Sequence, residues 1–346
     1  MKIVDESRAI KRDLTQLLKM NPLDLSLINQ MGIVCYETSH LGEALYWFKK
    51  AVDIQPTIQN LNNLGYFYLR EGEPNSGADE GLWAYQPRKA IPILEKAISM
   101  KPNSHFPYAL LGEAYLAVDE FQLAEKVLTQ ALKMKDTQAN QYNLGSAFYE
   151  QKKYVEAGEM FRKIVIGCGE SGIYRANLNY GVCLGLVGEK KKAEEIAETG
   201  LRSSYDEKLL FSEIYYLVGN HKSYVETFPE YSTTYYLDEV TTSQYLYAFC
   251  QLGDYSRAQN IFDDYIEDRQ QLILEMEQDL DTDEISRLTK IHNIQDEIKS
   301  IQEIFDNIKS KNGNQPKFHF NPGMETDCYL FGCLRHEIPE YGNQKA

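Results

Sequence analysis

The chain has 346 residues and a formal net charge of −15, from 51 acidic and 36 basic side chains. Hydrophobic residues make up 43% and charged residues 25%, which is typical of a folded globular protein. Because so acidic a surface repels phosphate backbones and anionic lipid, neither nucleic acid nor membrane is an expected partner. Scattered cysteines, with no signal-like segment and no apolar run of ~20 residues, predict a reduced protein of the cytoplasm.

Residues 1–24 are predicted to form an N-terminal capping helix, since they are charged, amphipathic and terminated by Asn21 and Pro22. A recurring pattern of small residues follows over residues 25–269. It comprises Gly32, Gly65, Gly112, Gly145 and Gly181, then Ala44, Ala90, Ala124, Ala157 and Ala193, then the large residues Phe48, Leu94, Leu128 and Phe161. Small residues let the two helices of a hairpin approach closely, and large residues at helical spacing fill the gaps to the next hairpin.

Two kinds of stretch carry a resemblance to a known family. Asn62–Tyr68 and Tyr142–Tyr149 resemble helix A of the tetratricopeptide repeat, and Phe121–Ala124 and Tyr154–Ala157 resemble its turn into helix B. The resemblance implies an all-α fold, a right-handed superhelical solenoid of about seven repeats over residues 25–269. The sixth repeat is degenerate, with Tyr224 where alanine is expected.

The second repeat contains an insertion at 72–88, rich in Gly, Pro, Asn and Asp, which predicts a surface loop. Trp83 and Tyr85 lie in it. An exposed Trp83 would be an anchor for a partner. The simpler interpretation is that Trp83 folds back on its own hairpin.

Residues 261–310 are predicted to form a long helical hairpin that overlaps the last repeat. Its second helix carries apolar residues at heptad spacing: Ile291, Ile294, Ile298, Ile301, Phe305 and Ile308. These apolar residues pack against the preceding helix or, alternatively, form the interface of a homodimer. The tail, 311–346, is irregular but too aromatic for a disordered segment, so it packs on the last helices or lies in the repeat groove as an internal ligand.

No catalytic constellation is found, neither a phosphate-binding glycine loop nor a His-Glu-x-x-His helix, so the chain is predicted to be no enzyme and to need no cofactor. No metal site is predicted either. The alternative ligand set would be Cys328, Cys333, His336 and His319, but the Cys-x4-Cys spacing is looser than in typical zinc knuckles.

In the family that the chain resembles, the A helices line a concave face, and amide side chains recur there. A side-chain amide donates and accepts, so it can hold the backbone of an extended peptide regardless of sequence. The predicted peptide-binding residues are Gln30, Asn62, Asn63, Asn143, Asn179, Tyr66, Tyr142, Tyr149 and Arg175. The alternative interpretation is that asparagine is simply common at this position of the repeat.

These features predict a non-catalytic scaffold that binds a protein or an extended peptide in the concave groove. The alternative is a regulatory-peptide receptor or inhibitor whose superhelical pitch changes when a short peptide binds. Receptors of that kind that regulate transcription usually carry a helix-turn-helix before the repeats, and residues 1–24 are too few for one.

Overall fold

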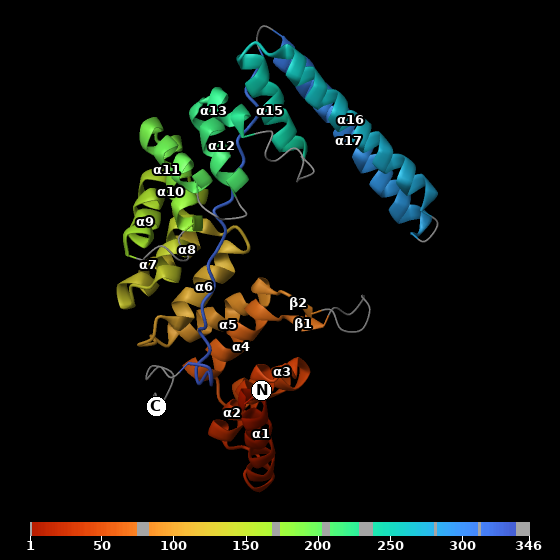
Figure 1. Cartoon of the computed structure of the whole chain (residues 1–346). Coiled ribbons are helices and arrows are strands. Elements are labelled where there is room, and N and C mark those ends of the chain that lie inside the picture. Colours follow the sequence, from red (N-terminus) through yellow and green to blue (C-terminus); the bar gives the residue numbers. More distant parts are fainter. Residues whose placement is uncertain are drawn as a thin grey trace. The chain divides into compact units, whose positions relative to one another are not determined.

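The computed structural model describes residues 2–74, 83–167, 174–202, 208–227, 238–279, 282–310 and 313–336 (Figure 1). The chain divides into two compact units: unit 1 is Met1–Gly167 with Pro322–Ala346, and unit 2 is Cys168–Asn321. The described strands are β1 (Glu73–Pro74) and β2 (Trp83–Ala84), an antiparallel pair with Glu73 opposite Ala84. All other regular structure in these ranges is helical, so the predicted all-α fold of repeated helical hairpins is confirmed.

Unit 1 is a series of helices in which each packs on the next. The helices are α1 (Lys2–Met20), α2 (Leu25–Glu37), α3 (Leu41–Ile54), α4 (Ile58–Arg70), α5 (Pro87–Ser99), α6 (Phe106–Leu116), α7 (Phe121–Met134), α8 (Gln138–Glu150) and α9 (Tyr154–Gly167). The even-numbered helices from α4 to α8 also contact one another, so they form one continuous layer. That layer is the surface on which the functional site is built.

The recurring glycines mark where the two helices of a hairpin are closest. A Cβ at Gly65 would lie 2.6 Å from Leu94 of its partner helix, and one at Gly112 would lie 2.4 Å from Leu128. The large residue therefore sits over the glycine of its own hairpin, and not only in the gap to the next hairpin as the sequence pattern suggested. Phe48 does both, because it covers Gly32 and its ring lies 6.0 Å from Phe67 of the next hairpin.

Short polar side chains fix the starts of the α4 and α8 helices. Thr57 and Thr137 accept hydrogen bonds from the backbone N–H of Asn60 and Asn140, the third residue of each helix. Asn60 in turn donates to the carbonyls of Ala51 and Gln55, and Asn140 to that of Lys135. Asn60 and Asn140 thus hold the connections between neighbouring hairpins. The other asparagines of α4 and α8 face away from these connections.

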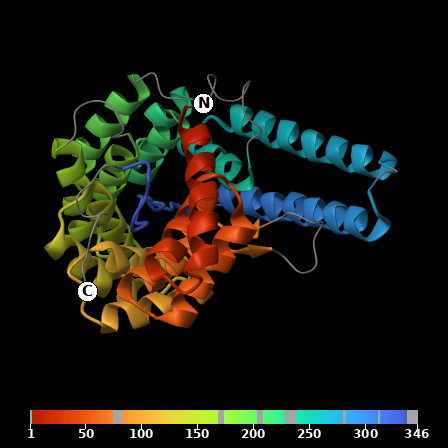
Figure 2. The same ribbon diagram turned by 90° about the horizontal axis from the view of Figure 1, so that it is seen from below.

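Unit 2 contains α10 (Tyr174–Leu186), α11 (Lys190–Arg202), α12 (Lys208–Val218), α13 (His221–Glu226), α15 (Glu239–Gln251), α16 (Tyr255–Gln278) and α17 (Glu284–Lys309). Figure 2 shows α16 and α17 as a long pair lying side by side. The rings of Phe262 and Phe305 stack across this pair with centroids 4.9 Å apart. Ile291, Ile294, Ile301 and Ile308 of α17 are buried within the single chain. Within the described ranges, each helix is too short or too polar to cross a lipid bilayer.

The close approach at the hairpin glycines predicts a large difference between two glycine-to-alanine substitutions. Gly112→Ala forces a methyl group against Leu128 and should destabilise the protein by about 1–3 kcal/mol. The matched control is Gly42→Ala in α3, where a Cβ meets nothing within 4 Å. It should be neutral or stabilising by up to about 1 kcal/mol. Urea unfolding of both variants tests this, and equal midpoints would show that the glycines do not set the helix spacing.

Candidate functional site

The chain's own tail lies across the helices of unit 1. We call residues Pro322–His336 the tail segment, and the side chains of α4, α6 and α8 that contact it the tail-binding face. The segment begins at α8, where the Tyr142 hydroxyl donates to the Pro322 carbonyl over 2.6 Å. It ends at α2, where the Arg335 guanidinium donates to the carboxylate of Glu37. In Figure 1 the blue tail can be followed along α6 and α4 to the N-terminal hairpins.

Each of two asparagines forms hydrogen bonds with both main-chain polar groups, the N–H and the C=O, of one residue in the tail segment. Asn143 donates to the Glu325 carbonyl over 2.8 Å and accepts from the Glu325 N–H over 2.8 Å. Asn63 does the same with Phe331, at 3.0 Å for the carbonyl and 2.9 Å for the N–H. Each amide therefore pairs with the tail as a residue of a neighbouring β-strand would, and the pairing requires no particular tail side chain.

Two further side chains hold the stretch between these asparagines. Asn62 donates to the Tyr329 carbonyl over 2.7 Å, and Arg70 donates to the Asp327 carbonyl over 3.2 Å. The bonded carbonyls thus belong to alternate residues from Glu325 to Phe331. Alternate carbonyls of an extended chain point the same way, so the tail segment presents one edge of its backbone to the helices.

The aromatic side chains of the tail segment are buried against α6. Tyr329 is 1% exposed and Phe331 4% exposed. The Phe106 ring lies 5.4 Å from the Tyr329 ring and 5.0 Å from the Phe331 ring, and His105 meets Tyr329 edge-on at 5.7 Å. Each such aromatic pair adds about 0.5–1.5 kcal/mol to the free energy of area burial. The apolar contacts thus stabilise the tail segment on the helices, and the asparagines fix its register.

A buried ion pair lies beneath the tail. Glu113 of α6 is fully buried, and its carboxylate lies 2.8 Å from the Arg70 guanidinium, which also contacts the tail and the face of the Tyr66 ring. Burial raises the pKa of Glu113 to about 7, because desolvation of its carboxylate outweighs the attraction of Arg70, and the nearby Asp327 adds repulsion. Arg70 therefore connects a buried acid to the tail backbone.

The structure brings together four of the predicted peptide-binding residues, Asn62, Asn63, Tyr142 and Asn143, on the tail backbone. Tyr66 joins them through a hydrogen bond with the Cys328 thiol. Tyr149 instead packs on the ring of Tyr154, 5.3 Å away, and Gln30 donates to Ser26 of its own helix.

The remaining predicted residues belong to α10 and to the insertion. Asn179 and Arg175 belong to α10 of unit 2, where Asn179 is buried and Arg175 is exposed and donates to Tyr174. Tyr85 of the insertion is 46% exposed, whereas the side chain of Trp83 lies outside the part of the chain described in atomic detail.

Of the alternative metal ligands, three lie close together. One sulfur or nitrogen atom each from Cys328, Cys333 and His336 falls within 4.8 Å of the other two. His319 is not part of that group and instead lines a cavity of unit 2 with Glu239 and Ser243.

Sequence reasoning did not single out Glu113, His105 or Glu37 as part of the site. A signal existed for Glu113, since it is the one charged residue within the otherwise apolar helix Phe106–Leu116. His105 precedes α6 and Glu37 is the last residue of α2, and polar residues are expected at helix ends in any case, so their sequence context carries no comparable signal.

Comparison with known proteins identifies the repeat. Residues 109–173, which include α7 to α9 and most of α6, match the family model described as tetratricopeptide repeat. This part of the chain therefore consists of tetratricopeptide repeats. No curated protein matches its sequence.

Among solved structures, the chain is similar to a tetratricopeptide repeat protein from Parabacteroides merdae, with 14% identity over 80% of this chain and 98% of that one and a TM-score of 0.53. It is also similar to PilW, a type IV pilus biogenesis factor, with 18% identity over 71% of this chain and 98% of that one and a TM-score of 0.49. A third similar structure is YrrB, described as a TPR protein with an unusual peptide-binding site. It is 16% identical over 62% of this chain and 96% of that one, with a TM-score of 0.46. At these identities, the likeness concerns the fold.

The paired bonds of the asparagines predict how the tail segment opens. Asn63→Ala removes two hydrogen bonds to Phe331, each contributing about 1 kcal/mol, so the tail amides should exchange with deuterium roughly tenfold to thirtyfold faster. Gln30→Ala, which removes an amide that bonds within α2, is the control and should leave exchange unchanged. Hydrogen exchange of fragments covering the tail segment measures this, and equal rates in both variants would contradict the arrangement.

The buried acid predicts a pH dependence. Because the pKa of Glu113 is raised from 4.5 to about 7, the folded state retains a proton that the unfolded state releases, and stability falls as pH rises through that window. Glu113→Gln should remove this component and flatten the stability profile between pH 5 and pH 8. Glu156→Gln, at an exposed position of α9, controls for the loss of one charge. A profile unchanged by Glu113→Gln would show that the carboxylate is ionised in the folded protein throughout.

Proposed function

We propose that the tail-binding face is a peptide-binding groove and that the protein is a non-catalytic scaffold holding an extended polypeptide segment. The observation that carries the proposal is the two-sided bonding of main-chain groups by Asn63 and Asn143. A surface that bonds backbone amides at defined intervals suits any extended chain, whichever protein supplies it.

In this proposal the tail segment is the resident ligand of the groove. It is joined covalently to the helices, so its effective concentration is high and an outside peptide has to displace it. The side chains it buries indicate the ligand class: an extended segment with aromatic residues at two positions separated by one, as in Tyr329 and Phe331. Phe106 supplies a wide, rigid contact area for such rings.

The proposal is tested with the full chain and a labelled synthetic peptide of the tail sequence 322–336. The double variant Tyr329→Ser/Phe331→Ser removes the aromatic anchors of the resident tail and should free the groove. Fluorescence anisotropy should then show saturable binding of the peptide to this variant, at least tenfold tighter than to the unaltered chain, whose groove is occupied.

Two further variants locate that binding. Adding Asn63→Ala and Asn143→Ala to the freed chain should weaken peptide binding at least tenfold, because four main-chain hydrogen bonds are lost. Adding Gln30→Ala should leave it unchanged. Equal affinity with and without the two asparagines would show that the peptide binds elsewhere and that the tail contact is structural.

A further inference from the structure

A compact turn brings the end of the tail segment back upon itself. The Cys333 N–H donates to the Leu330 carbonyl over 3.2 Å, and Gly332 between them has φ of +83°. This is the geometry of a type II turn, whose third position requires a positive φ and therefore favours glycine. The turn reverses the chain between Cys328 and Cys333, so that two cysteines separated by four residues face each other.

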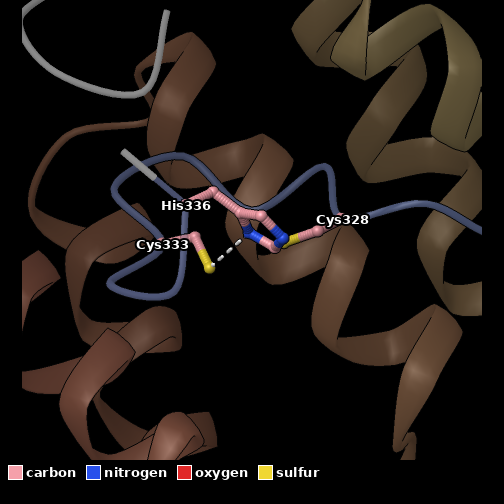
Figure 3. A group of neighbouring side chains, drawn as sticks. All are labelled: Cys328, Cys333 and His336. Carbon is pink, nitrogen blue, oxygen red and sulfur yellow. Dashed lines mark hydrogen bonds between the residues drawn. The ribbon is translucent and has the colours of Figure 1, made fainter. Parts of the chain in front are cut away.

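Three potential ligands converge at this turn. Figure 3 shows the side chains of Cys328, Cys333 and His336 pointing toward one another. The Cys333 sulfur lies 3.2 Å from the His336 Nδ1, and all three ligand atoms lie within 4.8 Å of one another. In a tetrahedral zinc site, with bonds of about 2.0–2.3 Å, neighbouring ligand atoms are about 3.5 Å apart. The three side chains need only small movements to reach that spacing.

One acidic side chain approaches this group from outside the tail. The Glu37 carboxylate, at the end of α2, places its Oε1 3.3 Å from the Cys333 sulfur, while its Oε2 accepts from Arg335. Arg335 thus orients the carboxylate so that one oxygen is directed at the Cys333 thiol, as partners of metal-binding carboxylates do. Two thiolates and one carboxylate beside a divalent cation leave one negative charge, which the Arg335 guanidinium balances.

The surroundings suit a bound cation. Cys333 is buried and Cys328 is half-buried, whereas His336 is exposed, so an ion can enter from the side of His336. The other described cysteines, Cys35, Cys183 and Cys250, have no such neighbours grouped as ligands.

From this convergence we propose that Cys328, Cys333 and His336 bind a zinc ion, with Glu37 of α2 as the fourth ligand. Two sulfurs, an imidazole and a carboxylate in a tetrahedral arrangement are ligands typical of zinc. Binding releases the remaining thiol protons to solvent, so affinity falls as the pH is lowered. The site connects the tail to α2 and stands on the ligand group alone, whether or not the groove accepts an outside peptide.

The test uses the reduced, metal-free full chain titrated with Co²⁺ as a spectroscopic probe and then with Zn²⁺. One equivalent of Co²⁺ should produce thiolate-to-cobalt charge-transfer absorption, and Zn²⁺ should displace it. Cys328→Ser and Cys333→Ser should each weaken Zn²⁺ binding at least tenfold in competition with a chelator. Cys250→Ser, in unit 2, is the matched control and should bind as the unaltered chain does.

His336→Ala removes an exposed ligand and does not threaten the fold, so it keeps the test decisive if a cysteine variant unfolds. It should also weaken Zn²⁺ binding at least tenfold, and Glu37→Gln should weaken it less. Absence of the charge-transfer band, or unchanged affinity in His336→Ala, overturns the proposal. Because the readout is metal binding itself, it is separate from the peptide-binding test of the groove.

Discussion

A polypeptide buried in an extended conformation must pair its backbone N–H and C=O groups, since each unpaired group costs free energy comparable to a lost hydrogen bond. In the described ranges the one sheet is the β1–β2 pair, which the tail segment does not join, and the helices that the segment crosses have used their own backbone groups internally. Side-chain amides on α4 and α8 meet this requirement. Asn63 and Asn143 are themselves almost inaccessible to water, so without the tail their donors and acceptors would need water or another chain. The positions of the tail, the aromatic contacts and the turn at Gly332 all depend on this pairing.

Much of the fold could be read from the sequence, for a physical reason. A repeat that stacks on copies of itself constrains the same positions in every unit. The same close packing therefore requires a glycine at Gly32, Gly65 and Gly112, which makes the pattern visible in the sequence. The sequence did not determine whether the large residue packs against its own hairpin or against the next one. Phe48, Leu94 and Leu128 lie over the glycine of their own hairpin, which periodicity cannot distinguish from a contact with the next one. The two-residue strands of the insertion also carried no periodic signal, because two residues define no period.

The site was predictable where it followed the repeat and not where it followed the tail. Asn63 and Asn143 occupy one repeat position, and that position, together with the chemistry of amides, indicated a grip on main-chain groups. Asn179 occupies the same repeat position in unit 2. The sequence left two places open for the tail because its aromatic residues suit any apolar surface. Its register depends on contacts between residues nearly 270 positions apart, such as Asn63 with Phe331, and local patterns do not contain them.

The tail runs opposite to the order of the repeats, from α8 at its beginning to α2 at its end. Unit 1 is therefore assembled from the first and last parts of the chain, with all of unit 2 between them. During synthesis at about 5–20 residues per second, the helices of unit 1 emerge on the order of ten to thirty seconds before the tail segment. Over that interval the asparagines of α4 and α8 have no tail segment to bind. Every newly made chain thus passes through a stage in which the residues of the tail-binding face have been made and their own occupant does not yet exist.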